Sequence, residues 1–153
     1  MGGKGNPGVA GLVKQLPGAV GYVELIYALQ NTMPYATLKN RSGNWIVPSL
    51  ASTSESGNVA VPDDATKINL TDSAAANGYP ISTFTWILVY KDQGYDNRAK
   101  DKVTAEMKML WWMVHDAQQY AEPLAYARLP KAVVAKAEAI LKSVTYNGAP
   151  VLQ

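Results

Sequence analysis

The chemistry that the sequence offers most directly is anion binding near its first residues. Residues 3–8 read G-K-G-N-P-G and match the pattern G-x-G-x-x-G. A glycine loop that opens a helix presents free backbone N–H groups and the positive end of the helix dipole, which together suit phosphate or another anion. The candidate anion loop consists of Gly3, Lys4, Gly5 and Asn6.

The same pattern occurs in dinucleotide-binding folds, where a strand comes directly before the loop. In this sequence only Met1 and Gly2 precede the loop. Glu24 stands roughly where a ribose-binding acid would lie, but it opens a predicted helix instead of ending a second strand. No Gly-Lys pair is followed by Ser or Thr, so the P-loop pattern is absent. The sequence therefore favours a glycine-rich entry to a helix over a nucleotide fingerprint.

A second group with possible chemistry is the pair His115-Asp116. Adjacent helical side chains point about 100° apart, so these two do not form a catalytic pair by themselves. A hydrogen-bonded histidine near a helix end is the favoured interpretation. No nucleophile elbow, paired-carboxylate signature or metal-ligand spacing stands out, and the sequence predicts no catalytic residue, no cofactor and no metal site.

Composition excludes several classes of protein. Of 153 residues, 48% are apolar and 17% are charged, which is typical of a folded chain. The formal net charge of +2 is too weak to favour nucleic-acid binding. The absence of cysteine excludes disulfides and thiolate metal sites, and a single histidine disfavours a zinc site or a histidine triad. The longest apolar run, 109–114, is far shorter than the ~20 residues that span a bilayer. The sequence also begins without a signal-peptide pattern.

Apolar periodicity predicts the elements that would position the anion loop. Asn6 suits the N-cap of a first helix and Pro7 its first position, while Pro17 favours an end at Leu16. Residues 19–23 are small and β-branched and predict a short buried strand. A helix is expected over 24–31.

The rest of the chain combines turns, one strand and two long helices. Turn residues between 36–39 and 45–47 indicate a hairpin. Residues 83–90 give the strongest strand pattern, with both faces expected to be covered by protein. Helices are expected over 97–119 and 130–144, with Asn147-Gly148 at the end of the second. The predicted class is α/β or mixed α+β.

Four separated blocks resemble one family in order and spacing. They are residues 2–10 (GGKGNPGVA), 16–24 (LPGAVGYVE), 79–93 (YPISTFTWILVYKDQ) and 126–134 (YARLPKAVV). These blocks are similar to the periplasmic phosphate-binding proteins of bacterial ABC transporters. The resemblance implies an α/β, type II periplasmic binding-protein fold, in which phosphate lies between two lobes and is held by hydrogen bonds alone. It also implies docking on an ABC permease and a periplasmic or extracellular location.

The resemblance further implies that this chain matches only the C-terminal half of such a protein, as incomplete parts of two lobes. Residues 1–78 would be part of the second lobe, and residues 79–153 would be the crossover strand and C-terminal helices of the first. The residues that bind phosphate in this family lie mainly upstream and have no match here. Gly3 to Asn6 would therefore lie next to those residues and would not contact the phosphate directly. Phosphate binding would then need the N-terminal half, and the partner would be that half or a second copy. The alternative is a structural or self-assembling protein that does not bind phosphate.

Overall fold

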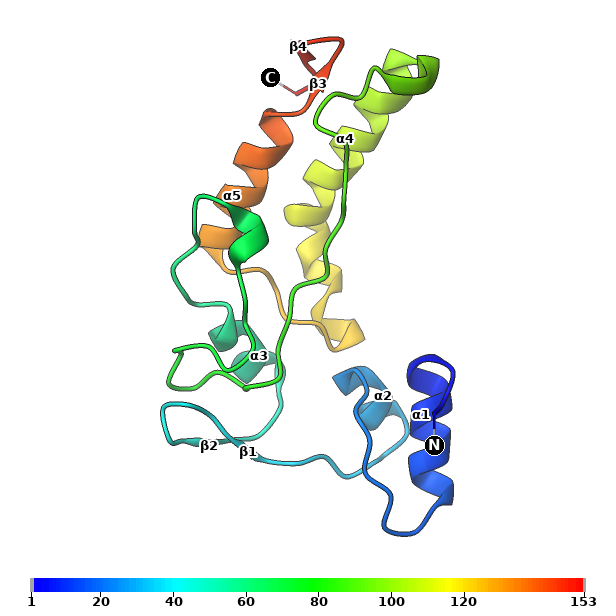
Figure 1. Ribbon diagram of the computed structural model, residues 1–153, viewed down its shortest axis with the longest axis vertical. Coiled ribbons are helices and arrows are strands. Elements are labelled where there is room, and N and C mark those ends of the chain that lie inside the picture. The colour runs from blue at the N-terminus through cyan, green and yellow to red at the C-terminus, as the bar shows by residue number, and fades with distance from the viewer. Residues whose placement is uncertain (1, 153) are drawn as a thin grey trace.

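The computed structural model describes residues 2–152, a mixed arrangement of helices and short strands (Figure 1). The helices are α1 (Gly5–Gln15), α2 (Leu25–Gln30), α3 (Leu50–Ser56), α4 (Lys100–Val114) and α5 (Lys131–Lys142). The strands are β1 (Leu38–Lys39), β2 (Trp45–Ile46), β3 (Thr145–Tyr146) and β4 (Ala149–Pro150). Single 3-10 turns lie at Ala65–Lys67, Tyr95–Asn97, Asp116–Tyr120 and Glu122–Leu124.

Helices α1 and α2 form a small helical pair at one end of the molecule (Figure 1). The predicted first helix is confirmed: it ends at Gln15, and the backbone N–H of the capping residue Leu16 donates to the Leu12 carbonyl. The prediction that Asn6 is the N-cap is wrong. Lys4 occupies that position, and Asn6 lies inside the first turn. The Asn6 side-chain oxygen instead accepts a hydrogen bond from the Glu24 backbone N–H at 3.2 Å.

Helices α4 and α5 pack side by side and contribute most of a cluster of buried apolar side chains (Figure 1). The cluster consists of Met107 and Leu110 of α4, Leu141 of α5 and Val144 just after α5, and Val103 of α4 is also fully buried. Both predicted helices are therefore present, and each contributes buried apolar residues, three from α4 and Leu141 from α5. Both helices are shorter than predicted, because α4 ends where His115 leaves the helical conformation and α5 ends at Lys142.

Two hairpins flank the helices. The predicted hairpin is confirmed as the antiparallel pair β1–β2, with Leu38 opposite Ile46. The second hairpin, β3–β4, was not predicted from sequence. Its turn is Asn147-Gly148, where both residues have positive φ, 49° and 79°. Asn-Gly is the preferred pair for such a two-residue turn, so the prediction that it ends a helix is wrong.

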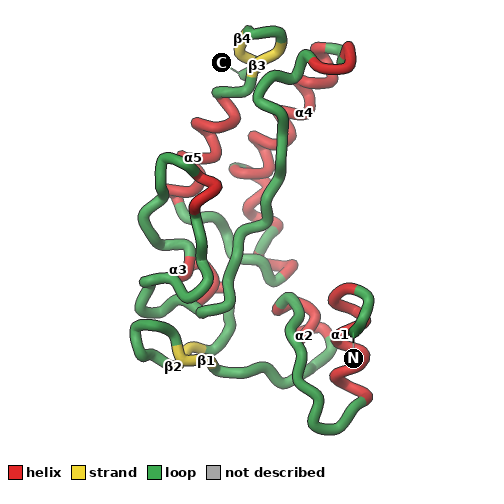
Figure 2. Tube along the Cα trace, in the orientation of Figure 1, coloured by secondary structure: helices red, strands yellow, loops and turns green. Residues whose placement is uncertain are grey.

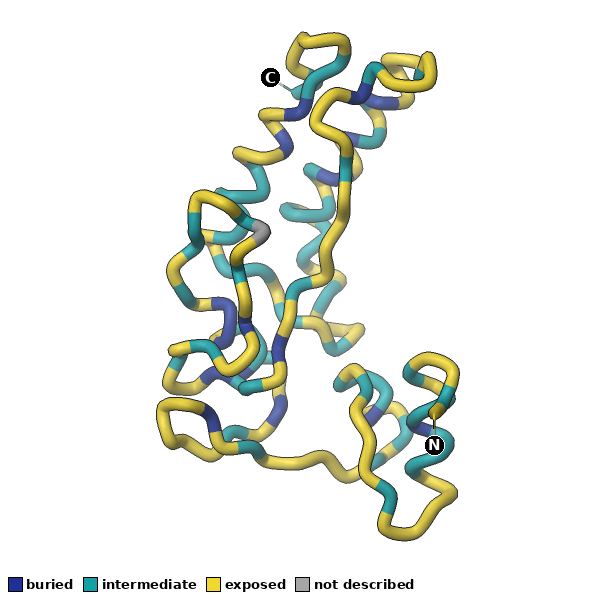
Figure 3. The backbone as a smooth tube through the Cα atoms, viewed as in Figure 1, coloured by how far each residue is buried: buried dark blue, intermediate teal, exposed yellow. Residues whose placement is uncertain are grey.

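The two predicted strands at 19–23 and 83–90 do not form. Both segments are extended loops without strand pairing in the described part of the chain (Figure 2). The expected burial is also wrong, since Val20 is 95% exposed and Leu88 is 93% exposed. Much of 83–90 lies open to solvent while it runs beside α4 (Figure 3). A strand needs a neighbouring strand to hydrogen-bond with, and no neighbour stands beside either segment.

Candidate functional site

The candidate anion loop lies at the N-terminus of α1, as predicted. Gly3 is folded tightly against the first turn, because a Cβ atom there would lie 2.5 Å from the Gly8 carbonyl carbon and the Val9 nitrogen. Only glycine fits such a close approach of two backbone segments. Gly5 has φ +66°, a second position where glycine is favoured. Two of the pattern's glycines are thus explained by the backbone, Gly3 by close packing and Gly5 by its positive φ.

A chain of hydrogen bonds connects this loop to the C-terminal half of the chain. Asn6 Oδ1 accepts from the Glu24 backbone N–H at 3.2 Å. The Glu24 carboxylate accepts from the Tyr126 hydroxyl at 2.6 Å. That hydrogen bond to a carboxylate raises the pKa of the Tyr126 hydroxyl above its ordinary value, and desolvation adds to the effect. The role of Tyr126 could not be recognised from the sequence, because its partner lies 102 positions away.

The loop has backbone N–H groups that could contact an anion, but it does not form an enclosed site. Lys4 and Gly5 are exposed, and no side chain caps the N–H groups of the first turn. Pro7 has no N–H, so one donor of that turn is missing. The uncapped groups carry the positive end of the helix dipole. Since these donors face water, the loop can attract an anion but cannot remove its hydration shell alone.

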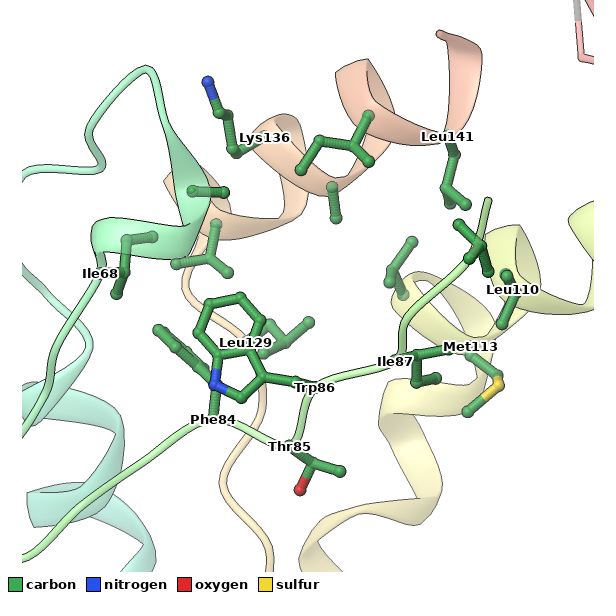
Figure 4. Close-up of a pocket in the computed structure, with 16 residues that line it drawn as sticks. Ile68, Phe84, Thr85, Trp86, Ile87, Leu110, Met113, Leu129, Lys136 and Leu141 are labelled. Atoms are coloured by element: carbon green, nitrogen blue, oxygen red, sulfur yellow. The ribbon is translucent and has the colours of Figure 1, made fainter. Parts of the chain in front are cut away.

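An apolar groove of the described residues lies elsewhere, between the extended segment 83–89 and helices α4 and α5. It has a volume of about 200 Å³ and an apolar lining (Figure 4). Lys136 is the charged residue of its lining, and its Nζ donates to the backbone carbonyl of Asp63. A phosphate needs several converging donors, so the chemistry of this groove does not suit it.

His115 is held as a hydrogen-bonded histidine at the end of α4, as the sequence favoured. Its Nδ1 is 2.7 Å from the Trp111 carbonyl oxygen, and its Nε2 is 2.9 Å from Glu138 Oε1. The ring stacks on Trp111 with centroids 4.5 Å apart. The bond to the Trp111 carbonyl, followed by that to Glu138, raises the His115 pKa above its ordinary value. These contacts join α4 to α5, and nothing in the sequence near His115 identified Glu138 as the partner.

Residues 2–152 also bear on metal and membrane binding. No cluster of three or more His, Asp or Glu residues that could hold a metal ion occurs among them. No helix within that range is long and apolar enough to cross a membrane.

Comparison with known proteins shows what this chain is similar to. No family model matches the sequence. The resemblance to phosphate-binding proteins is nevertheless confirmed by curated relatives over about nine tenths of the chain. They are named phosphate-binding protein PstS. That of Xylella fastidiosa is 38% identical over 141 residues, which cover 91% of this chain. Those of Methanocaldococcus jannaschii and Pasteurella multocida are 33% and 31% identical over 86% and 94% of this chain.

The chain spans only part of the length of these relatives. The matched region covers 38% of the Xylella protein, 36% of the Methanocaldococcus protein and 41% of the Pasteurella protein. About nine tenths of this chain takes part in the match, so segments from both 1–78 and 79–153 are included. The similarity thus extends over most of this chain but over about two fifths of a relative.

Proposed function

We propose that this chain is part of a solute-binding protein that captures inorganic phosphate for uptake through an ABC transporter. The observation that carries the proposal is its 38% identity to a phosphate-binding protein PstS over 91% of its own length. The chain would bind phosphate without transforming it. Its weak net charge of +2 fits such a role better than nucleic-acid binding.

We assign residues 1–78 to part of a second lobe and residues 79–153 to the crossover segment and C-terminal helices of a first lobe, both incomplete in this chain. Support comes from two separate helical clusters, α1 with α2 and α4 with α5. The Tyr126–Glu24 hydrogen bond then crosses between the lobes. In a protein that closes around its ligand, such a bond would be one of the contacts that hold the lobes in register.

Phosphate binding is proposed to require the remainder of a PstS-like protein, or a second copy of this chain, as partner. The loop of Gly3, Lys4, Gly5 and Asn6 would lie behind the phosphate and add the positive potential of α1 and Lys4. This proposal is supported by the backbone N–H groups of the first turn of α1, which are exposed and have no capping side chain. Docking on an ABC permease and a periplasmic or extracellular location follow from the same family proposal.

Calorimetry tests the proposal. Phosphate would be titrated into this chain alone, and into the chain mixed with the part of the Xylella relative that lies outside the matched region. We expect weak or no binding to the chain alone and measurable binding to the mixture. Sulfate would serve as the control anion. A mixture that forms a complex but binds no phosphate would refute the functional proposal.

A pair of lysine variants tests the loop separately. Lys4→Ala removes the charge beside the start of α1, while Lys39→Ala removes an exposed charge on β1. We expect Lys4→Ala to weaken phosphate binding by the mixture a few-fold, since a nearby exposed charge contributes about 1 kcal/mol or less. Lys39→Ala should leave the affinity unchanged. Equal effects of the two substitutions would show that the loop does not contribute to phosphate binding.

A further inference from the structure

We propose that Asn147-Gly148 is a latent site of spontaneous deamidation, which the Asp92 carboxylate protects while the β3–β4 hairpin is in place. This inference concerns a chemical modification of the chain and does not depend on phosphate binding. It rests on contacts that residues of this chain make with one another. A second Asn-Gly pair, at residues 77–78, provides an internal comparison.

The reaction joins the backbone of Gly148 to the side chain of Asn147. Glycine has no Cβ atom to hinder the approach of its own nitrogen, so Asn-Gly is prone to this cyclisation. The Gly148 nitrogen loses its proton to a base in solution and forms a bond to Asn147 Cγ. The Cγ–Nδ2 bond breaks, and the amide group leaves as ammonia after taking up a proton from water. Water then opens the cyclic imide to aspartate or isoaspartate.

The Asp92 carboxylate holds the nitrogen that this reaction needs. Its Oδ2 accepts from the Gly148 N–H at 2.8 Å, and its Oδ1 accepts from the Asn147 N–H at 3.3 Å. Cyclisation requires the Gly148 nitrogen to give up its proton and to turn toward Asn147 Cγ, which breaks the contact with Asp92. The nitrogen anion would also form beside an existing negative charge. The carboxylate therefore opposes the reaction.

Asp92 keeps its charge wherever this deamidation is fast. Its hydrogen bonds, led by that from the Thr145 hydroxyl, lower the pKa of Asp92 to about 2. The cyclisation needs a base and runs at neutral and alkaline pH, far above that value. Protection by the charged carboxylate therefore covers the whole range in which Asn147 is at risk.

The side chain of Asn147 is restrained as well. A Cβ atom on Gly94 would lie 1.9 Å from Asn147 Oδ1 and 2.9 Å from Asn147 Cγ, so the carboxamide lies directly against the Gly94 backbone. The Gly94 N–H donates to Asp92 Oδ1 at 2.8 Å, which fixes that backbone beside the turn. A rotation that brings Asn147 Cγ to the Gly148 nitrogen gives up this contact. Both reacting groups are thus held by the segment that contains Asp92.

The Asn-Gly pair at 77–78 lacks such a carboxylate at its glycine nitrogen. Asn77 is exposed, and the Gly78 N–H donates to the Ala75 carbonyl at 3.0 Å. A neutral carbonyl opposes a negative charge on the neighbouring nitrogen less than a carboxylate does. The same dipeptide therefore has two different acceptors in one chain, and we expect two different rates of deamidation.

Deamidation at residue 147 would weaken the attachment of the hairpin. The new carboxylate adds a negative charge beside Asp92, and isoaspartate lengthens the backbone of the turn by a carbon atom. Val144 directly precedes β3 and is buried, and Val151 and Leu152 follow β4 and pack against the α4–α5 core. Loss of the hairpin contacts would therefore uncover one end of that core, and the change would be irreversible.

Peptide mapping by mass spectrometry measures both sites in one sample. Trypsin places Asn77 on residues 68–91 and Asn147 on residues 143–153. In the native chain at mildly alkaline pH, we expect deamidation at Asn147 to be several-fold slower than at Asn77. In urea the two rates should become similar, because neither glycine nitrogen keeps its acceptor. A native Asn147 that reacts as fast as it does in urea would overturn the proposal.

Asp92→Ala tests the carboxylate directly, because it removes both acceptor oxygens. We expect it to raise the rate at Asn147 several-fold, toward the rate in urea, and to leave Asn77 unchanged. Asp63→Ala removes an exposed charge elsewhere and should change neither rate. Circular dichroism checks that the variants are folded, and Asp92→Asn replaces Asp92→Ala if the latter is not. An unchanged Asn147 rate in the folded Asp92 variant would refute protection by Asp92.

Thr145→Val separates the carboxylate from general loosening of the hairpin. It removes the hydroxyl bond to Asp92 Oδ2 but leaves the Gly148 N–H contact with the carboxylate. We expect it to raise the Asn147 rate much less than Asp92→Ala does. If Thr145→Val accelerated deamidation as much as Asp92→Ala, the packing of the hairpin would be the source of protection, and the role assigned to Asp92 would be wrong.

Discussion

The Tyr126 hydroxyl donates a 2.6 Å hydrogen bond to the Glu24 carboxylate, joining residues 102 positions apart. Tyr126 follows Ala125, whose left-handed conformation (φ 58°) redirects the chain after the 3-10 turns. Glu24 comes directly before α2, and its N–H donates to Asn6. The bond therefore ties the region after α4 to the α1–α2 pair and, through Asn6, to the anion loop.

Removing this hydroxyl should loosen the α1–α2 pair. For Tyr126→Phe we expect faster amide hydrogen exchange in α1 and α2 and a loss of about 1 kcal/mol or less in the free energy of unfolding, as for a partly exposed hydrogen bond. Tyr120→Phe is the control, since Tyr120 has a ring contact with Trp112 and no hydrogen bond among those described for its hydroxyl. Identical exchange in the two variants would show that the bond does not restrain the helices.

Truncating the centre of the α4–α5 core should have a much larger effect on stability. Met107 is fully buried, while Met109, two residues along the same helix, is 53% exposed. We expect Met107→Ala to lower the free energy of unfolding by about 2–5 kcal/mol, the range for a large core side chain. Met109→Ala should change it by about 0.5 kcal/mol or less. Urea unfolding followed by circular dichroism measures both, and similar losses would contradict this placement of the core.

The helices could be predicted because their signal is local. Val103, Met107 and Leu110 repeat at helical spacing, and their burial needs only a second apolar helix nearby. The strand over 83–90 has an equally clear pattern, but a strand also needs hydrogen-bonding neighbours. The pattern shows that these residues can form a strand. Whether a neighbouring strand is present depends on other parts of the sequence. The prediction failed for that reason.

Long-range contacts also determined the role of Asn6 in the anion loop and the conformation of the Asn147-Gly148 turn. The glycine pattern correctly located the start of a helix, but the role of Asn6 was wrong because the Glu24 N–H takes its side-chain oxygen. Asn147-Gly148 suits both a helix end and a hairpin turn. Its hydrogen bonds to Asp92 fix the hairpin, and Asp92 lies more than fifty residues earlier. No local pattern could have distinguished the two outcomes.

Asp92 should contribute stability only while it is ionised. Its carboxylate accepts hydrogen bonds from the Thr145 hydroxyl at 2.7 Å, from the Gly148 and Gly94 N–H groups at 2.8 Å each, and from the Asn147 N–H at 3.3 Å. These bonds, led by Thr145, lower the pKa of Asp92 to about 2. Because the folded-state pKa lies below the unfolded value, the stabilisation is present above about pH 4 and is lost as the pH falls toward 2.

Asp92→Asn tests whether the charge of Asp92 holds the β3–β4 hairpin in place. The substituted amide keeps one acceptor oxygen and loses the charge, so the β3–β4 hairpin should detach more readily. We expect the variant to be less stable than wild type at neutral pH and to approach it near about pH 2. Asp63→Asn, at an exposed position, should follow the wild-type pH profile. A constant difference between Asp92→Asn and wild type from neutral to acid pH would contradict the role of the charge.

His115 should stabilise the α4–α5 contact with the opposite dependence on pH. The Trp111 carbonyl can only accept, so His115 Nδ1 carries a proton in both charge states, and protonating Nε2 adds a donor toward Glu138 Oε1. The bond to the Trp111 carbonyl, followed by that to Glu138, raises the pKa of His115. A raised folded-state pKa means that the stabilisation is complete below about pH 6.5 and is lost as the pH rises through the folded value.

Since His115 is the single histidine of the chain, its NMR titration can be assigned without ambiguity. We expect Glu138→Gln to lower the measured pKa and to reduce the fall in stability across that pH range, because the carboxylate partner of Nε2 is gone. Glu55→Gln, on an exposed position of α3, should leave both unchanged. A His115 pKa that stays the same in Glu138→Gln would mean that the Trp111 carbonyl alone holds the imidazolium, and the ion pair between α4 and α5 would then carry no part of the pH dependence.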